Sequence, residues 1–172
     1  MTDIAELHER LRRFESQQAI RVCINRYMAL CDALAADTPL DELALLFTEA
    51  AVWEGKGAKY ASSFGGYRGR DAIRSMFATY MKTPAHFALN VHFLTSEVIE
   101  VDGNLGQGTW VMLQTSTFND GASHLNAARL VVRFAMEEGR WRIAHFQTEN
   151  LFSRPVTGWN SDAPLPVPGS DH

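Results

Sequence analysis

Asp32 and His92 are the two residues of this chain whose types and settings most strongly suggest chemistry. Asp32 follows a segment from Ile20 that contains few charged residues. At 3.6 residues per turn, Asp32 lies beside Met and Ala positions, so we expect both sides of a helix here to be covered. A covered carboxylate needs a hydrogen-bonding cation or imidazole, because an unpaired buried charge is costly. The apolar stripe of this predicted helix consists of Ile20, Cys23, Ile24, Tyr27, Leu30, Cys31 and Leu34.

His92 lies in an alternating segment that is typical of a strand. One face would carry Phe87, Leu89, Val91 and Phe93, and the other His86, Asn90 and His92. A strand histidine by itself is more often solvated or structural than catalytic. An Asp32–His92 pair would explain both residues, because the carboxylate would fix the imidazole tautomer and leave Nε2 as a general base.

Tyr27 and several later side chains are candidates for a ligand pocket. Tyr27 belongs to the apolar stripe, so it either packs in the core or polarises a substrate oxygen with its phenol. The aromatic, Met and amide candidates have the same two interpretations, core or pocket. We name as candidate substrate-binding residues Trp53, Trp110, Met112, Gln114, Asn126, Phe146 and Asn150.

Other chemistries fit the sequence poorly, and we expect no metal and no cofactor. His145 and Glu149 are four residues apart on a predicted strand, which separates them by about 13 Å, too far for a compact metal site. The chain contains no G-x-G-x-x-G, G-x-x-x-x-G-K-[ST] or G-x-S-x-G motif. Cys23 and Cys31 are about 12 Å apart along one helix, so we expect reduced core thiols rather than a disulfide.

The order of the predicted elements is helices first and an antiparallel meander second, which is an α+β arrangement. Residues 3–35 form one long helix or two consecutive ones, the first of them amphipathic. Leu40–Phe47 is a short helix, Ala50–Glu54 a strand, Gly55–Gly66 a hairpin or loop, and residues 69–81 a helix with Asp71 in its first turn. Asp, Asn and Gly turns separate four long strands, Leu89–Val101, Leu105–Phe118, Ser123–Met136 and Trp141–Phe152.

Size and charge indicate one domain and exclude some partners. The chain has 172 residues, 46% hydrophobic and 21% charged, with a net charge of −4. We expect a single domain over residues 1–152 and a Pro-rich C-terminal arm over 153–172. The charge offers no case for nucleic acid or an anionic membrane. No signal peptide or apolar membrane span is evident, so we expect a cytoplasmic location.

The ordered motifs of the chain resemble the SnoaL-like branch of the nuclear transport factor 2-like superfamily. They are Arg26–Asp32, the helix-to-strand step Leu43–Glu54, Tyr67–Ile73, His92-Phe93, Val101–Gly103 and Gly139–Ile143. The resemblance implies a cone-shaped α+β barrel, with N-terminal helices packed in a curved antiparallel sheet around a deep apolar pocket.

The resemblance also implies roles for particular residues. Dehydratases and a dehydrochlorinase of this superfamily pair a helix aspartate with a strand histidine, and these fall on Asp32 and His92. A tyrosine of the bile-acid dehydratase falls on Tyr27. Two positions differ: an acid on the following strand of that enzyme is Gln114 here, and its late arginine falls near Asn150.

We therefore predict a cofactor-independent lyase that acts on a hydrophobic cyclic or aromatic small molecule by dehydratase-type elimination or a related retro-aldol loss. Two alternatives stay open. One is an isomerase or polyketide-cyclase-like enzyme, and the other is a non-catalytic binding or assembly subunit like the dioxygenase β chains. A curved sheet with large apolar residues on both faces also predicts a homo-oligomer, and the resemblance favours a trimer over a dimer.

Overall fold

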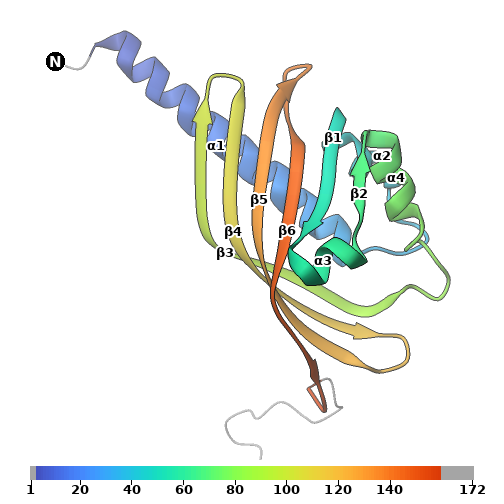
Figure 1. Cartoon of the computed structure of the whole chain (residues 1–172). Helices are drawn as coiled ribbons and strands as arrows, with labels where there is room; N and C mark the ends of the chain where they lie inside the picture. Colours follow the sequence, from blue (N-terminus) through green and yellow to red (C-terminus); the bar gives the residue numbers. More distant parts are fainter. Residues whose placement is uncertain (1–2, 160–172) are drawn as a thin grey trace, which may run out of the picture.

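The computed structural model describes residues 3–159, which fold as one curled sheet wrapped around a long helix (Figure 1). The six strands are ordered β2-β1-β6-β5-β4-β3. This is the expected α+β cone. In chain order the elements are α1 (Ile4–Asp32), α2 (Leu40–Leu45), β1 (Phe47–Lys56), α3 (Gly57–Ser63), β2 (Gly66–Arg68), α4 (Arg70–Ala78), β3 (Phe87–Asp102), β4 (Leu105–Phe118), β5 (Ser123–Glu137) and β6 (Arg140–Val156).

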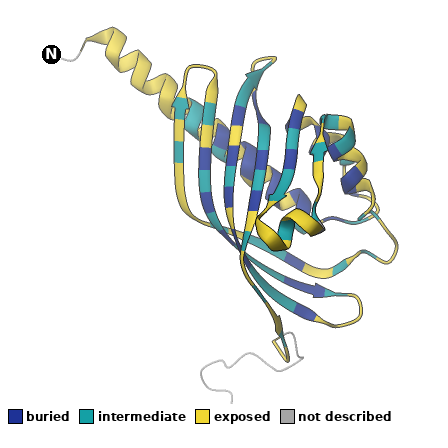
Figure 2. Ribbon diagram, viewed as in Figure 1, coloured by how far each residue is buried: buried dark blue, intermediate teal, exposed yellow. Residues whose placement is uncertain are grey.

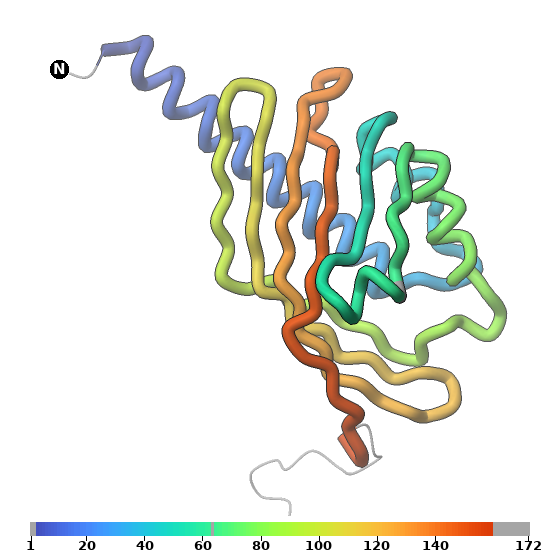
Figure 3. The backbone as a smooth tube through the Cα atoms, in the orientation of Figure 1, coloured from blue at the N-terminus to red at the C-terminus, as the bar shows by residue number. Residues whose placement is uncertain are grey.

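The four long strands bend sharply along their length, as the backbone trace shows (Figure 3). The pairing of β3 with β4 shifts register between Thr95 and Val98, where Ser96 has a positive φ of 54°. The pairing of β5 with β6 shifts between Ala127 and Ala128. Such bulges bend a strand and increase its twist, so they turn the sheet into an open cone.

Helix α1 packs its C-terminal half against the inside of this cone (Figure 2). The predicted apolar stripe is buried from Ile20 to Leu34. Helix and sheet approach closely at Gly106 of β4, where a side chain would collide with Ile20. The opposite side of the helix is not covered as expected: Asn25 and Ala29 are exposed, and the Asp32 side chain is 27% exposed. The cone covers Met28 on this side of the helix and leaves the neighbouring positions partly open to solvent.

The segment after α2 differs most from the sequence prediction. Strand β1 begins at Phe47 and is ten residues long, and it pairs with β6 in parallel, so the sheet is mixed rather than wholly antiparallel. The expected loop at residues 55–66 contains helix α3, whose Tyr60 packs on Phe64, the residue that follows the helix, with ring centroids 4.9 Å apart. Phe64 also lies against Trp53, at 5.8 Å. Tertiary packing of these rings outweighs the loop signal of the Gly and Ser residues.

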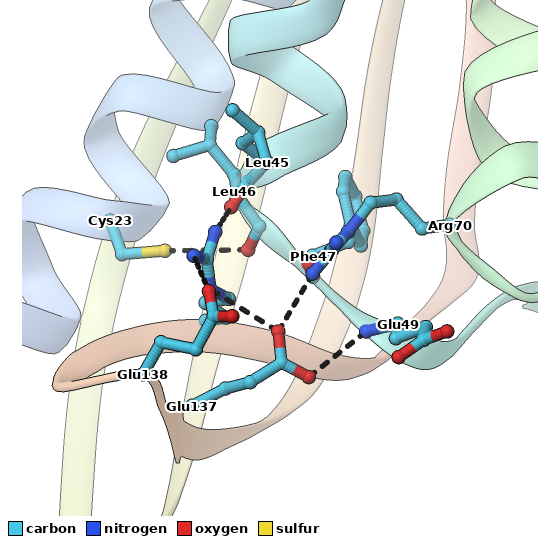
Figure 4. Close-up of polar contacts among 9 residues, drawn as sticks. Cys23, Leu45, Leu46, Phe47, Glu49, Arg70, Glu137 and Glu138 are labelled. Carbon is cyan, nitrogen blue, oxygen red and sulfur yellow. Dashed lines mark hydrogen bonds and ion pairs between the residues drawn. The ribbon is translucent and has the colours of Figure 1, made fainter.

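A polar cluster fastens β1 to the turn between β5 and β6 (Figure 4). Glu137 accepts hydrogen bonds from Arg70 Nη2 at 2.7 Å and from the backbone N–H of Glu49 at 3.1 Å. Arg142 is buried, donates to the carbonyl of Leu45 and lies 3.3 Å from the Glu137 carboxylate. These contacts hold the start of β1 against β6, where the parallel pairing begins.

Strand β6 continues to Val156, so the first residues of the expected arm belong to the sheet. Ser153 pairs with Asn126 and Val156 with Ser123. The rest of the arm, from residue 160, lies outside the described residues. Among residues 3–159 no helix is both long enough and apolar enough to cross a bilayer.

Candidate active site

A cavity of about 440 Å³ lies between the concave face of the sheet and helices α1, α3 and α4. This volume is within the range typical of small-molecule sites. Aromatic residues are the largest group in the lining, which suits an apolar ring compound. The aromatic residues that line the cavity are Tyr27, Trp53, Tyr60, Phe64, Tyr67, Phe77, Tyr80, Phe87, Phe118 and Phe146.

His92 lines the cavity, and Asp32 lies behind its ring. His92 Nδ1 is 2.6 Å from Asp32 Oδ1, and the same oxygen accepts the backbone N–H of His92 at 3.0 Å. The His92 side chain is only 11% exposed. An ionised carboxylate can only accept, so Nδ1 carries the proton and Nε2 has the free lone pair. Because Asp32 occupies the Nδ1 side, Nε2 is the ring nitrogen available to a molecule in the cavity.

Asn90 connects this pair to the neighbouring strand. Its Nδ2 donates to the carbonyl of Cys31 at 3.2 Å, next to Asp32 in α1. Its Oδ1 accepts from Gln114 Nε2 and from Ser116 Oγ, both at 2.8 Å. Since the Cys31 carbonyl can only accept, the orientation of the Asn90 amide is determined by its surroundings. Strand β3 therefore holds the end of α1 at two adjacent residues, Cys31 and Asp32.

Tyr27 lies deep in the cavity wall. Its hydroxyl accepts from Trp53 Nε1 at 3.0 Å, and the Trp53 ring stacks on Phe146 at 5.6 Å. Burial raises the pKa of Tyr27 well above its ordinary value. The phenol therefore stays protonated and can act as a hydrogen-bond donor but not as a base.

The two cysteines are not candidates for nucleophiles. Burial raises the pKa of Cys23 and that of Cys31 to about 12. Each thiol therefore stays protonated at neutral pH, whereas nucleophilic attack requires the thiolate. Both are free thiols, as expected.

Comparison with known protein families identifies the family of this chain. The family model of the SnoaL-like domain matches residues 12–147. The chain belongs to the SnoaL-like family. Comparison with proteins of curated function gives no match.

Solved structures share the fold of this SnoaL-like protein at low sequence identity. An NTF2-like protein with a cystatin-like fold from Novosphingobium aromaticivorans has a TM-score of 0.70 and 23% identity, over 88% of this chain and 92% of that one. A type 3 hexachlorocyclohexane dehydrochlorinase from Novosphingobium barchaimii has a TM-score of 0.70 and 18% identity, over 88% and 97%. A candidate scytalone dehydratase from N. aromaticivorans has a TM-score of 0.68 and 16% identity, over 92% and 97%.

The structure brings most of the predicted site residues of this SnoaL-like protein to one cavity. Those that line it are Tyr27, Trp53, His92, Met112, Gln114, Asn126 and Phe146.

Trp110 and Asn150, predicted as substrate-binding residues, do not line the cavity. The Trp110 ring is 2% exposed, packs on Phe134 and lies over Gly108, where a side chain would collide with it. Trp110 fits into the core because Gly108 has no side chain that would occupy the space of its ring. Asn150 donates to Tyr60 OH at 3.2 Å and to the Phe152 carbonyl at 3.1 Å, so it supports α3 from behind.

Sequence reasoning missed several lining residues of this SnoaL-like protein. Ser116 could have been found, since strand alternation places it on the face of Gln114, just as it placed Asn90 on the face of His92. Tyr60 and Phe64 could not, because they lie in a segment that has the composition of a loop. Among the described residues, no three His, Cys, Asp or Glu side chains are close enough together to hold a metal ion.

Proposed function

We propose that this SnoaL-like protein is a cofactor-independent lyase that eliminates a small group from a hydrophobic cyclic or aromatic molecule. The observation that carries the proposal is the 2.6 Å contact of His92 Nδ1 with Asp32, with Nε2 left to the cavity. A histidine oriented in this way by a carboxylate suits general-base catalysis.

In the proposed reaction, His92 Nε2 removes a proton from a substrate C–H bond. The released electron pair forms a double bond to the neighbouring carbon, from which the leaving group departs with its bonding electrons. For a retro-aldol loss, the proton comes instead from a hydroxyl, whose oxygen forms a C=O double bond while the neighbouring C–C bond breaks, and the carbon that leaves with the electron pair is then protonated. Asp32 stabilises the imidazolium, which returns its proton to the leaving group or to water.

An oxygen that becomes negative during the reaction would be stabilised by a protonated phenol. Tyr27 supplies this donor, because its raised pKa keeps the proton in place.

Two of the structural neighbours support elimination chemistry through their names, a dehydrochlorinase and a candidate dehydratase. At 18% and 16% identity they show a shared fold, and the support for a shared reaction type comes from the Asp32–His92 pair.

The test is a screen of hydroxylated and chlorinated cyclic compounds in D₂O, followed by mass spectrometry. We expect loss of a small group from at least one compound, slowed by about 10²- to 10⁴-fold in His92→Gln. Asp32→Asn should cost a similar factor, because it favours the wrong tautomer. Equal rates in wild type and both folded variants would exclude the mechanism.

The same screen separates the alternatives. An isomerase or cyclase would rearrange the compound without loss of mass, with deuterium incorporated at the carbon that exchanges its proton. A binding subunit would neither convert nor exchange any compound.

We further propose that the reaction needs no metal, because His92 and Asp32 supply the base without one. Activity should survive dialysis against a chelator. Activity that disappears and returns only on addition of zinc or iron would contradict this.

A further inference from the structure

The base is the first member of a row of polar side chains that crosses four strands of the sheet. The pairing register joins His92 of β3 to Gln114 of β4, Gln114 to Asn126 of β5, and Asn126 to Ser153 of β6. All four residues line the cavity. Residues paired directly across antiparallel strands project from the same face of the sheet, so these side chains form one line along the cavity wall.

The spacing of this row follows from strand geometry. Neighbouring strands are about 4.8 Å apart, so Gln114 lies about 5 Å from His92 and Asn126 about 10 Å from it. On one side the row is bordered by an apolar one, since Leu94 pairs with Met112 and Met112 with Ala128. On the other side lies a second polar row, in which Asn90 pairs with Ser116 and Ser116 with His124. A molecule that lies over the apolar row would therefore meet polar groups along one edge only.

The hydrogen-bonding direction of Gln114 can be deduced. Asn90 donates to the Cys31 carbonyl, so its Oδ1 must face Gln114, which must present Nε2 to it. The Gln114 carbonyl Oε1 then remains, and it makes no hydrogen bond to another described residue. Gln114 therefore presents an acceptor to the cavity. The side-chain amide of Asn126 makes no hydrogen bond to another residue of 3–159 either, and it can both donate and accept.

Apart from the Tyr27 hydroxyl, the side chains that line the opposite wall from α1 and α4 are apolar. Tyr27, Met76 and Phe77 line it from the helices. Among the described lining residues, Lys59 of α3 is the only Lys, Arg, Asp or Glu. An uncharged flat ring system matches a space between aromatic side chains and a row of neutral amides.

We infer that Gln114 and Asn126 bind hydroxyl groups along one edge of an uncharged ring substrate. One hydroxyl donates to Gln114 beside the atom that loses its proton to His92, and a second, about 5 Å further along, binds Asn126. The inference rests on the proposed function only where it takes His92 as the base. The binding of hydroxyls by Gln114 and Asn126 is argued separately, from the strand pairing and from the hydrogen-bonding groups of the two amides.

The test is titration of the full chain with naphthalene-1,3-diol, whose two hydroxyls are separated by about the spacing of neighbouring strands, and with 1,3-difluoronaphthalene, followed by calorimetry and by quenching of tryptophan fluorescence. The two probes have similar shapes, but only the diol donates hydrogen bonds. We expect the wild type to bind the diol about tenfold more tightly, and Gln114→Met and Asn126→Leu each to lose most of that preference. Met112→Leu, from the apolar row, should keep it.

Asn126→Ser provides a milder second variant should Asn126→Leu fold poorly, and it should lower the diol preference by less. Equal affinity of the wild type for both probes would overturn the inference. So would a preference that persists in both row variants and disappears in His92→Gln, because the imidazole would then be the hydroxyl acceptor.

The outcomes also separate this inference from the proposed function. If no compound is converted but the diol preference depends on Gln114 and Asn126, hydroxyl binding by these residues is supported and the proposed lyase activity is not. If conversion depends on His92 but no diol preference exists, the proposed lyase activity is supported and hydroxyl binding by Gln114 and Asn126 is not.

Discussion

At the residue scale, the proposed reactivity of His92 depends on side chains that hold its ring in position. Asp32 is 27% exposed, so its position is not secured by burial. Hydrogen bonds hold it instead: the backbone and ring of His92 contact its Oδ1, and Asn90 holds the preceding residue, Cys31. Asn90 is thus a positioning residue for the pair.

We therefore predict that Asn90→Ala lowers kcat by about tenfold with a smaller change in KM, because the pair loses its alignment. The pH dependence of kcat should shift as well, since the base is less firmly paired. Thr115→Val, on the other face of β4 beside Ser116, is the matched control and should behave as the wild type. A KM effect alone would show that Asn90 only shapes the pocket.

The buried thiols predict a loss of stability at alkaline pH. The pKa of a solvated thiol is 9.0, whereas burial raises the pKa of Cys23 and of Cys31 to about 12 in the folded chain. Between these values the unfolded chain has released its thiol protons and the folded chain has not. The free energy of unfolding should therefore fall as pH rises from 9 to 12, by up to about 1.4 kcal/mol per pH unit and thiol.

Urea unfolding at pH 8 and at pH 10 measures this effect. Cys23→Ala should be less stable at both values, because it leaves a cavity, but its stability should fall less between them. An unchanged pH dependence would mean that the thiols ionise alike in both states.

At the element scale, the periodicity of the sequence predicted the helices and strands that local residue patterns determine. It did not predict the pairings that depend on contacts between distant residues. The long helix, the four long strands and their turns lie close to their expected positions, because period and turn residues are local signals. The parallel pairing of β1 with β6 could not be predicted in this way. It joins residues distant in the sequence and depends on the Glu137 contacts with Arg70 and Glu49.

Those contacts yield a stability prediction. Glu137→Ala should lower the free energy of unfolding by about 1–2 kcal/mol, because Arg70 and the Glu49 N–H lose a partly buried acceptor. Chemical denaturation measures it. Glu138→Ala is the matched control: its carboxylate is 80% exposed, so the change should stay within about 0.5 kcal/mol. Equal effects of both substitutions would contradict a special role of Glu137.

At the scale of the whole molecule, the site is made from segments that no local pattern connects. The pairing of Asp32 with His92 was predictable for two reasons. A covered carboxylate at Asp32 needs a partner, and the family resemblance pairs a helix aspartate with a strand histidine at these two positions. Trp110 shows the limit of such reasoning, since an aromatic residue on a predicted strand fits a core position and a pocket position equally well. That difference is decided by Gly108 and by the packing on Phe134.

The outer surface of the molecule suggests assembly. The N-terminal half of α1 projects past the edge of the sheet and is exposed (Figures 1 and 2). Ile4, Leu7, Leu11 and Phe14 on it are 52–71% exposed, at the spacing of a coiled-coil seam. On the sheet, Phe93 is 49% exposed. Apolar patches of this kind mark contact surfaces, and we propose that the chain forms a homo-oligomer, with a trimer favoured by the family resemblance.

This proposal predicts a particle mass of about three times the chain mass of 19.2 kDa in light scattering at micromolar concentration. Introducing charge into the exposed stripe by Leu7→Glu together with Leu11→Glu should shift the mass towards the monomer, because the contact would bury two carboxylates. Glu9→Ala, on the other side of α1, removes only an exposed pair with Arg12 and should leave the mass unchanged. The cavity lies within one chain, so the double variant should keep its fold and its ligand affinity. A wild type that is monomeric under these conditions would refute the assembly, and an unchanged mass of the double variant would exclude α1 as its contact surface.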